Sequence, residues 1–363
     1  MSNPRIGILG AGQLALMLAQ AARPLGAEVL CAGHPGDPAE QAAPVLQVDL
    51  ENTAQVAGFA SRVDLLTFES ENIAPHVLDH IHHFPLFPNA RAIATAQDRL
   101  HEKRFFESCD IEVAPYCAVD SLRDLYEALD SLGTPAILKT RRLGYDGKGQ
   151  FRITQRSQAP EALATLSPDP HLPTPCILEG FVNFEAEVSL LAARSRSGQI
   201  AFYPLIQNHH RDGILRTSIA PYSNLALQAQ AELYLRSLLE QLEYIGVLAV
   251  EFFVAGDKII ANEMAPRVHN SGHWTIEGSA TSQFTNHLRA ILDLPLGPTA
   301  SRPTVLLNCI GSMPPKSETD KFPTLFRHDY GKSPRPNRKV GHLTCFAEET
   351  ATIQEWQRRL NDQ

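Results

Sequence analysis

The segment Lys139-Thr-Arg-Arg-Leu-Gly-Tyr-Asp-Gly-Lys-Gly-Gln150 joins a lysine at the end of a short strand to a loop with three glycines. We expect that strand at Ala136 to Lys139, because a short apolar run leads into turn residues. Glycines leave backbone amides free to reach phosphate oxygens, and a lysine on the adjacent strand adds a point charge. The segment predicts a loop that closes over a nucleotide. The alternative is a surface hairpin with a solvated lysine.

Two glutamates lie on the two arms of a predicted hairpin around Gly256-Asp257. Glu251 is in Leu-Ala-Val-Glu-Phe-Phe and Glu263 is in Ile-Ile-Ala-Asn-Glu-Met, and an unpaired carboxylate is costly to bury in such apolar strands. Two carboxylates and the Asn262 carbonyl facing one cleft suit a hard cation that bridges to phosphates. The alternative is a cross-strand salt bridge, for which Lys258 could serve one glutamate but hardly both.

The glycine turn Gly10-Ala-Gly-Gln-Leu-Ala15 connects a predicted buried strand to a predicted helix at Gln13 to Ala22. Glycines at such a turn let the backbone approach a phosphate, and the helix N-terminus supplies amide donors. A dinucleotide site also needs an acidic residue at the end of the next strand, where Ala32, Gly33 and His34 stand. The pattern therefore leaves a monophosphate site or simple packing of helix against strand as the better interpretations.

Strands alternate with helical segments up to about residue 95, which predicts a parallel sheet covered on both faces. A mixed-charge helix is expected at Gln97 to Cys109, and a hairpin is expected at Glu185 to Pro204, turning at Ser197-Gly198. From about residue 300 the chain is rich in proline and ends in a short polar helix. The fold class predicted is therefore a combination of α/β and α+β units.

The net charge of −8 over 363 residues argues against a general nucleic-acid binder, because phosphate neutralisation needs a basic surface. The six cysteines are scattered and form no CxxC pair, which argues against a zinc site or a disulfide framework. We find neither a leader-like N-terminus nor an apolar segment long enough to span a membrane. We therefore expect a cytoplasmic protein with small-molecule partners and no nucleic acid or membrane partner.

In this order, the motifs resemble those of the ATP-grasp superfamily and, within it, the family of 5-(carboxyamino)imidazole ribonucleotide synthases. The resemblance covers nearly the whole chain. Its marks are Gly10-Ala-Gly-Gln-Leu14, Thr67-Phe-Glu-Ser-Glu-Asn72, Gln97-Asp-Arg-Leu-His-Glu-Lys103, Lys139 to Gln150, Phe202-Tyr-Pro-Leu205, His210-Arg-Asp-Gly-Ile-Leu-Arg216, Asn262-Glu-Met-Ala-Pro-Arg-Val-His-Asn-Ser-Gly-His-Trp274 and Gly331-Lys-Ser-Pro-Arg-Pro-Asn-Arg-Lys339. The Asn-Ser-Gly-His-Trp segment and the last of these, the C-terminal basic motif, are peculiar to that family.

The resemblance implies an ATP-grasp architecture with an N-terminal Rossmann-like substrate domain (residues 1–95), a central ATP-grasp domain (96–298) and a C-terminal domain (299–363). A mobile subdomain would span about residues 118–182. The implied activity is ATP- and bicarbonate-dependent carboxylation of the exocyclic amine of 5-aminoimidazole ribonucleotide, through carboxyphosphate, in purine biosynthesis. The implied cofactor is Mg²⁺ or alternatively Mn²⁺, and the implied assembly is a homodimer.

The resemblance also implies residues for ATP and the metal. Glu251 and Glu263 would hold Mg²⁺, assisted by Asn262. The set implied for ATP comprises phosphate contacts, the closing loop, the adenine pocket, a ribose contact and a histidine near the phosphates, namely Arg99 and Lys139; Gly144, Tyr145, Asp146, Gly147, Lys148, Gly149 and Gln150; Glu179, Gly180, Phe181 and Val182; Glu187; and His210.

For the ribonucleotide and the chemistry, the resemblance implies a second set of residues. Asp146 is the candidate for orienting or deprotonating the amine, and Tyr145, Arg267 and His269 are placed beside it. Contacts to the substrate are expected from the glycine turn, the acidic tip and the basic motif, namely Gly12, Gln13, Leu14, Glu69, Lys332, Arg335, Arg338 and Lys339. Glu69 and Glu71 could instead cap a helix N-terminus, where carboxylates are often found.

Three positions depart from the family's usual pattern. Ala15 and Leu143 stand where the family has glycine, and Leu16 stands where it has arginine. The leucine at 143 removes a flexible point from the loop, and the leucine at 16 removes a possible phosphate contact. Two other functions stay open: another ATP-grasp ligase, such as a formate-using glycinamide ribonucleotide transformylase or a biotin carboxylase-like enzyme, and a redox or non-enzymatic dinucleotide-binding protein.

Overall fold

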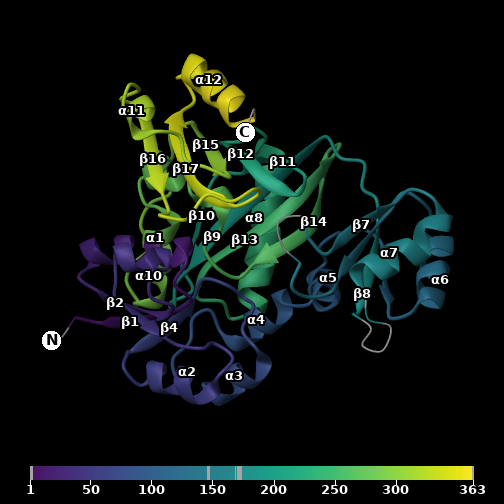
Figure 1. Cartoon of the computed structure of the whole chain (residues 1–363), viewed down its shortest axis with the longest axis horizontal. Coiled ribbons are helices and arrows are strands. Elements are labelled where there is room, and N and C mark those ends of the chain that lie inside the picture. The colour runs from purple at the N-terminus through teal and green to yellow at the C-terminus, as the bar shows by residue number, and fades with distance from the viewer. Residues whose placement is uncertain (1–2, 145–147, 168, 170–173, 362–363) are drawn as a thin grey trace.

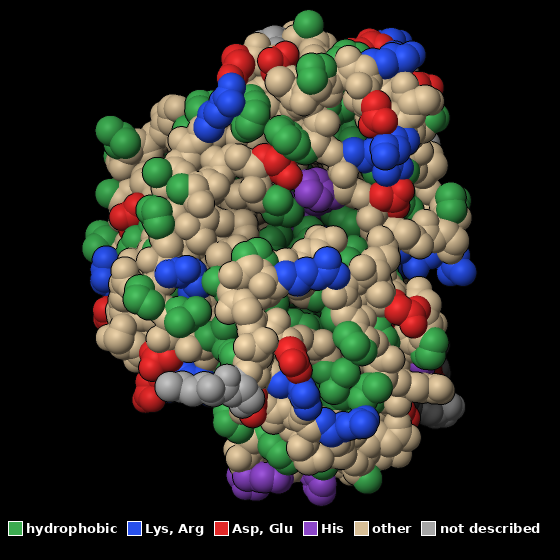
Figure 2. All heavy atoms as spheres, turned by 90° about the vertical axis from the view of Figure 1, so that its left-hand side faces the viewer, with side chains coloured by type: hydrophobic (Ala, Val, Ile, Leu, Met, Phe, Trp, Pro, Cys, Tyr) green, Lys and Arg blue, Asp and Glu red, His purple; other side chains and the backbone are tan. Residues whose placement is uncertain are grey.

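The computed structural model describes residues 3–144, 148–167, 169 and 174–361. Within these residues the strands form three sheets, and Figure 1 shows them as an N-terminal unit, a small antiparallel unit on the opposite side, and a long central sheet between them. No helix of the described residues is long and apolar enough to cross a membrane. On the face shown in Figure 2, side chains of both charge signs are interspersed around a hollow.

The N-terminal sheet is parallel, as the sequence predicts, and its strand order is β3-β2-β1-β4. Its strands read as short apolar runs because both faces of a parallel sheet are covered. In chain order the elements of this unit are β1 (Arg5–Leu9), α1 (Gln13–Ala22), η1 (Arg23–Leu25), β2 (Glu28–Gly33), η2 (Pro38–Gln41), β3 (Val45–Gln47), α2 (Thr53–Ala60), β4 (Leu65–Phe68) and α3 (Pro75–His80).

The small antiparallel sheet has the order β5-β8-β6-β7 and lies at the right of Figure 1 with helices α6 and α7 packed on it. It presents Lys139 at the end of its strand β6, as the sequence predicts. In chain order the elements are β5 (Tyr116–Val119), α6 (Leu122–Leu132), β6 (Ala136–Thr140), β7 (Gln150–Ile153), η3 (Arg156–Gln158), α7 (Ala159–Leu166) and β8 (Cys176–Gly180).

The central sheet has the path β14-β13-β9-β11-β12-β15-β17-β16, and β10 pairs with the C-terminal end of β9. Both predicted hairpins, β9 with β10 and β13 with β14, are confirmed. The strands are β9 (Ala186–Arg194), β10 (Ile200–Phe202), β11 (Ile206–Arg211), β12 (Ile214–Ala220), β13 (Gly246–Ala255), β14 (Lys258–Ala265), β15 (Thr304–Ile310), β16 (Leu325–Asp329) and β17 (Lys339–Phe346).

The last three strands were not predicted from the sequence, and they continue the central sheet through the pairing of β15 with β12. Strand β15 is buried along its whole length, so it shows no polar and apolar alternation, and prolines surround it. Such runs give no periodicity by which a strand can be recognised. The C-terminal segment therefore extends the sheet that carries the acidic hairpin.

Helices cover both faces of the central sheet, and several begin at a capping side chain. Asp98 accepts hydrogen bonds from the amides of Leu100 and His101 and so starts α5. The helices not yet given are α4 (Ala90–Ala96), α5 (Arg99–Ser108), α8 (Leu225–Gln241), η4 (Asn270–Gly272), α9 (Thr275–Gly278), α10 (Gln283–Ile291), α11 (Lys316–Thr319) and α12 (Thr350–Asn361).

The alternation along β9 explains how the polar residues of the sheet come to share one face. Val188 and Leu190 pack in the hydrophobic cluster beneath α8, whereas Leu191 and Ala193 pack in the cluster that contains α1 and α10. Because side chains on a strand alternate between faces, Glu187 and Ser189 lie on the second face. Polar residues on this face of the sheet contribute to the cavities described below.

Leu143 has φ of +62° and a side chain that is 72% exposed, at the position where the resembling family has glycine. A side chain is disfavoured in this left-handed region, and the greater freedom of glycine in the unfolded chain offsets part of the gain from its removal. We expect Leu143→Gly to raise the free energy of unfolding by roughly 0.5–1 kcal/mol, measured by urea denaturation. The matched control is Leu233→Gly in α8, which is also exposed and should lower it by about 0.5–1 kcal/mol. Equal losses in the two variants would contradict the role of φ.

Candidate active site

Two cavities lie next to each other on the central sheet, and they meet at Glu251 and Glu263 of the β13–β14 hairpin, which we call the acidic hairpin. The N-terminal cavity, of about 430 Å³, lies between the N-terminal unit and the central sheet, and the subdomain cavity, of about 370 Å³, lies between the small antiparallel sheet and the central sheet. Arg99, Glu251 and Glu263 line both. A group bound at these three residues is therefore accessible from either cavity.

Glu251 and Glu263 are register partners across β13 and β14, and a bulge follows Glu251. Arg99, the first residue of α5, donates from Nη1 to Glu263 Oε2 at 2.8 Å. Burial raises the pKa of Glu263, but the charge and hydrogen bond of Arg99 outweigh it and lower the pKa to about 2. Burial, helped by the charge of Glu263, raises the pKa of Glu251 to about 7. The alternative that Lys258 neutralises the pair is wrong, since Lys258 faces Glu112 at 3.4 Å.

The acidic pair and the neighbouring Asn262 together offer the oxygen ligands that a hard cation needs. Asn262 Oδ1 is buried and has no hydrogen-bond partner among the described residues. Within the same residues, no cluster of three or more histidine, cysteine, aspartate or glutamate side chains could hold a metal by itself. Two carboxylates and one amide oxygen leave coordination positions for phosphate oxygens and water, which is the pattern preferred by Mg²⁺.

A buried carboxylate holds the lysines of the subdomain cavity. Glu179 Oε2 accepts from Lys139 Nζ at 2.9 Å and lies 3.6 Å from Lys103 Nζ. Burial raises the pKa of Glu179, but these two cations outweigh it and lower the pKa to about 2. Lys103 also donates to the carbonyl oxygen of Asn262 at 2.9 Å, which ties α5 to the acidic hairpin. The Glu179 side chain therefore positions cations, a role that the sequence did not predict.

The far end of the subdomain cavity is apolar and aromatic. Phe184 stacks on Phe253 with ring centroids 4.7 Å apart, and Phe181 lies beneath the Arg152 guanidinium. Such a wall accommodates the face of a flat base. The predicted ATP residues that line this cavity are Arg99, Lys139, Lys148, Gly149, Gln150, Glu179, Gly180, Phe181, Val182, Glu187, His210, Asn262 and Glu263.

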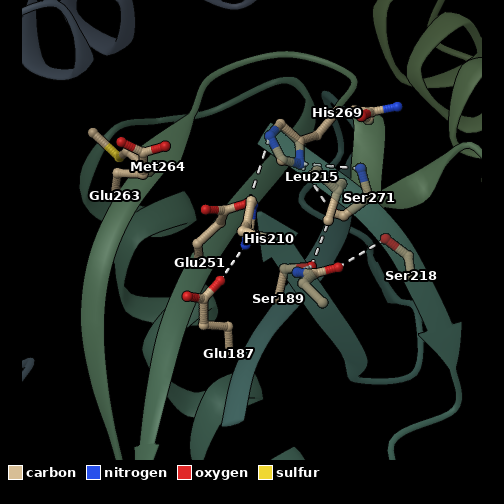
Figure 3. A network of polar contacts seen from close by, with 12 residues as sticks. Glu187, Ser189, His210, Leu215, Ser218, Glu251, Glu263, Met264, His269 and Ser271 are labelled. Carbon is tan, nitrogen blue, oxygen red and sulfur yellow. Dashed lines mark hydrogen bonds and ion pairs between the residues drawn. The ribbon is translucent and has the colours of Figure 1, made fainter. Parts of the chain in front are cut away.

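Glu187 and His210 form an ion pair through Glu187 Oε2 and His210 Nδ1, shown in Figure 3. Burial lowers the pKa of His210, but the hydrogen bond to Glu187 and the neighbouring carboxylates raise it overall. The carboxylates around His210 thus favour its protonated form. Whether Glu187 contacts a ribose stays a prediction.

In the N-terminal cavity, Glu69 occupies the position expected for a phosphate. Its carboxylate accepts from the amides of Gly12 at 2.6 Å and Ala15 at 3.2 Å, and burial raises the pKa of Glu69. The amides of the glycine turn therefore bond to a carboxyl group of the chain, as the helix-capping alternative for Glu69 expects, and a phosphate contact of this turn stays a prediction. Gln13 and Leu14 do line the cavity, whereas Leu16 is buried in α1 and does not line it.

Arg267 and His269 line the same cavity. Glu71 binds Arg267 with both oxygens, through Nε at 2.6 Å and Nη2 at 3.2 Å, so the acidic tip after β4 positions this arginine. His269 Nε2 lies 3.8 Å from Glu251 Oε1. Burial, with the charges of Arg267 and Lys339, lowers the pKa of His269 to about 3. The ring is therefore neutral at physiological pH.

The C-terminal basic motif divides between the cavity and the surface. Lys339 lines the N-terminal cavity, and Lys332 donates from Nζ to Gln13 Oε1 at its edge. Arg338 donates to Ser333 of its own loop, and Arg335 is exposed, with its backbone held by Gly311. The prediction that Arg335 contacts substrate is not supported by this arrangement.

In the glycine-rich loop, Gly144 lines the N-terminal cavity, while Tyr145, Asp146 and Gly147 lie outside the described residues.

Sequence reasoning missed the residue that anchors the glycine-rich loop. Asp98 accepts two hydrogen bonds from Arg141, at 3.0 and 2.7 Å, and one from Arg142 at 3.3 Å. Burial raises the pKa of Asp98, but these arginines lower it overall. Two adjacent arginines, separated from Lys139 only by Thr140, were the available signal. The hydrogen bonds to Asp98 and the bond from the amide of Arg99 to the carbonyl of Arg141 together tie the loop to α5.

Three family matches cover most of the chain. Residues 3–97 match the ribonucleotide synthetase preATP-grasp domain, residues 104–284 match the ATP-grasp domain, and residues 304–356 match the phosphoribosylaminoimidazole carboxylase C-terminal domain. The matched order agrees with the three units expected from the resemblance. The ATP-grasp architecture is confirmed.

Full-length relatives agree with these matches. The N5-carboxyaminoimidazole ribonucleotide synthase of Pseudomonas aeruginosa is 44% identical over 357 residues, which cover 96% of each chain. The crystal structure of the corresponding synthetase from Thermus thermophilus has a TM-score of 0.91 and 45% identity, covering 98% of both chains. The Aspergillus clavatus enzyme, in complex with ADP and 5-aminoimidazole ribonucleotide, has a TM-score of 0.89 and 28% identity, covering 99% of both chains.

Proposed function

The chain belongs to the family of N5-carboxyaminoimidazole ribonucleotide synthases, and on this premise we propose that it carboxylates the exocyclic amine of 5-aminoimidazole ribonucleotide. The reaction consumes ATP and bicarbonate and forms N5-carboxyaminoimidazole ribonucleotide, ADP and phosphate for purine biosynthesis. One observation carries the assignment to particular residues: Arg99, Glu251 and Glu263 line both cavities. Phosphoryl transfer from a nucleotide to a second substrate needs such a junction.

We assign the subdomain cavity to ATP and the N-terminal cavity to the ribonucleotide. A bicarbonate oxygen attacks the γ-phosphorus of ATP, the bond to the bridging oxygen breaks, and ADP leaves, giving carboxyphosphate. Lys139 and Arg99 stabilise charge on the transferring group. The substrate amine then forms the new C–N bond by one of two routes. It attacks the carbonyl carbon of carboxyphosphate and displaces phosphate, or it attacks CO₂ after carboxyphosphate has released CO₂ and phosphate. Asp146 is our candidate for orienting the amine or accepting its proton.

We propose Glu251, Glu263 and Asn262 as the residues that hold Mg²⁺ or Mn²⁺. Three features support the fit: register-paired carboxylates, an unpartnered buried amide oxygen, and the pKa of Glu251 raised to about 7 by burial and by the neighbouring carboxylate. When bound, the ion supplies Lewis-acid charge at the ATP phosphates. Arg99 holds the Glu263 side chain in place for it.

We extend the proposal to the assignments that the resemblance implies. The boundaries 1–95, 96–298 and 299–363 are proposed as domain limits, with residues 118–182 as the moving part. Tyr145, Arg267 and His269 are proposed beside Asp146 at the reacting centre, with Gly12, Gln13, Leu14, Glu69, Lys332, Arg338 and Lys339 around the ribonucleotide. A homodimer in the cytoplasm is proposed as the working form.

The proposed function is tested by phosphate release from ATP. We expect release to require bicarbonate and to be stimulated by 5-aminoimidazole ribonucleotide, with one carboxylated product formed per ATP consumed. Formate with glycinamide ribonucleotide, and biotin with bicarbonate, are the matched controls for other ATP-grasp ligases and should give no release. Stimulation by either control substrate would overturn the substrate assignment.

The raised pKa of Glu251 predicts a pH effect on stability without metal. The folded protein retains this proton at higher pH than the unfolded chain, so its contribution is present below pH 4.5 and is lost as the pH rises through about 7. We expect the metal-free wild type to lose on the order of 1–3 kcal/mol of unfolding free energy across this window relative to Glu251→Gln. Urea denaturation at several pH values measures the difference. A difference that is independent of pH would contradict the raised pKa.

A further inference from the structure

His269 is held by its backbone and by its ring. The amide group of Gln283, a buried residue at the start of α10, donates to the His269 carbonyl oxygen at 2.7 Å and accepts from the His269 amide at 2.9 Å. The ring caps the short helix η4: its Nδ1 accepts from the Ser271 amide at 3.4 Å and lies 2.9 Å from Ser271 Oγ. A backbone N–H can only donate, so this contact favours an Nδ1 that carries no proton, but at 3.4 Å it is too long to hold that tautomer by itself.

A chain of buried polar side chains leads to the same nitrogen. Ser218 Oγ donates to Asn208 Oδ1 at 2.8 Å, Asn208 Nδ2 donates to Ser189 Oγ at 2.9 Å, and Ser189 Oγ donates to Ser271 Oγ at 2.8 Å. All four residues are at most 3% exposed. Figure 3 shows Ser189, Ser271 and His269 following one another, with Glu251 on the other side of the ring. We call Ser218, Asn208, Ser189 and Ser271 the serine–asparagine chain.

The direction of donation in this chain is set by Asn208. Its amide presents an acceptor to Ser218 and a donor to Ser189, so the Ser189 proton is free to point to Ser271. Because Ser271 Oγ accepts that proton, its own single proton remains for His269 Nδ1. The hydroxyl and the amide of Ser271 therefore both donate to Nδ1.

We propose that the serine–asparagine chain positions His269 as the tautomer that carries its proton on Nε2, so that the histidine presents an N–H donor to the N-terminal cavity. Ser271, Ser189, Asn208 and Ser218 are positioning residues that act through His269. Nε2 faces the junction of the two cavities, 3.8 Å from Glu251 Oε1. An N–H at this place can stabilise negative charge on a carboxylate or on an oxygen of the bicarbonate-derived group, and it cannot accept a proton at Nε2.

The direct test is the ¹⁵N chemical shift of the His269 ring in the full-length protein without ligands, assigned with a His269→Gln variant. We expect a non-protonated Nδ1 and a protonated Nε2 in the wild type. Ser271→Ala keeps the amide but removes the hydroxyl, and it should populate the other tautomer. Asn208→Asp replaces the donor to Ser189 by an acceptor, so it should reverse the chain and have the same effect without touching His269.

The kinetic test rests on the proposed function, whereas the ¹⁵N shift does not, so the two can fail separately. Loss of one hydrogen bond to the ring should lower kcat of Ser271→Ala roughly three- to tenfold, with ATP affinity unchanged. Ser195→Ala is the matched control, since this buried serine after β9 bonds only within its own turn. It should change neither the tautomer nor kcat.

Three results would overturn the proposal. The first is a proton on Nδ1 in the wild type, and the second is an unchanged tautomer in Ser271→Ala. The third is an equal fall in kcat for Ser271→Ala and Ser195→Ala, which would indicate only a structural effect. If Asn208→Asp does not fold because it buries a charge, Ser271→Ala alone decides between these outcomes.

Discussion

Glu263→Gln is expected to lower ATP turnover by roughly 100- to 1000-fold at saturating Mg²⁺, because one charge is lost where both cavities meet. Glu263 is register-paired with Glu251, and its charge is maintained by Arg99. The neutral amide keeps the size of the side chain but neither attracts the cation nor balances the arginine. Phosphate release with bicarbonate and 5-aminoimidazole ribonucleotide measures the loss, and binding of a non-hydrolysable ATP analogue reports whether the nucleotide still enters.

A carboxylate that pairs with a residue of the same hairpin offers a matched comparison. Glu112 pairs with Lys258 of β14 at 3.4 Å, but its side chain is 47% exposed and lines neither cavity. Glu112→Gln should leave turnover within about twofold of wild type, since exposed pairs contribute roughly 0–1 kcal/mol to stability. Turnover of Glu263→Gln within the same twofold range would refute the metal assignment.

The second large effect is expected at the C-terminal basic motif. Replacing Lys332 and Arg338 together by alanine should raise the KM for 5-aminoimidazole ribonucleotide by roughly 100- to 10,000-fold, if each loses a charge-assisted bond to the phosphate. Lys332 already reaches Gln13 at the edge of the N-terminal cavity. ATP affinity should hardly change, because the proposed nucleotide contacts line the other cavity.

Arg335→Ala is the control for this loop, since Arg335 is exposed and its side chain lies outside both cavities. It removes one positive charge, as each single substitution does, and should leave the KM within about twofold. Separate titrations of the double variant with ATP and with the ribonucleotide identify which ligand is affected. A fall in ATP affinity with intact ribonucleotide binding would reverse the division of the two cavities.

The sequence was sufficient wherever a local pattern determines structure. The β1 to α1 turn, the strand that carries Lys139 and the hairpin of Glu251 and Glu263 were all predicted, because strand and helix periodicity extends over neighbouring residues. Glu251 and Glu263 were predicted as an acidic pair from the hairpin pattern, and Arg99 was predicted through the family resemblance. These residues converge through tertiary contacts, and the sequence indicated that convergence only because the resemblance implied the fold.

What the sequence did not reveal depends on partners far apart in the chain. Glu69 fills the glycine turn from 57 residues away, and the sequence offered helix capping by Glu69 only as an alternative, with no indication of which helix it would cap. Asp98 reaches Arg141 across 43 residues, and Glu179 serves Lys139 across 40. Charged residues of these types are equally common on solvated surfaces, so their pairing requires the fold to be known.

The contact between Lys332 and Gln13 joins residues 319 positions apart, and the carbonyl of Tyr330 accepts from Gln41 across 289 positions. During synthesis the first unit leaves the ribosome long before β16 and β17 exist, so the N-terminal cavity stays open on one side until the chain is almost complete. An enzyme truncated before Lys332 would retain the contacts of its nucleotide cavity but lack the wall of the other. Chain completion is thus a condition for an intact N-terminal cavity, and premature termination yields a product in which one wall of that cavity is missing.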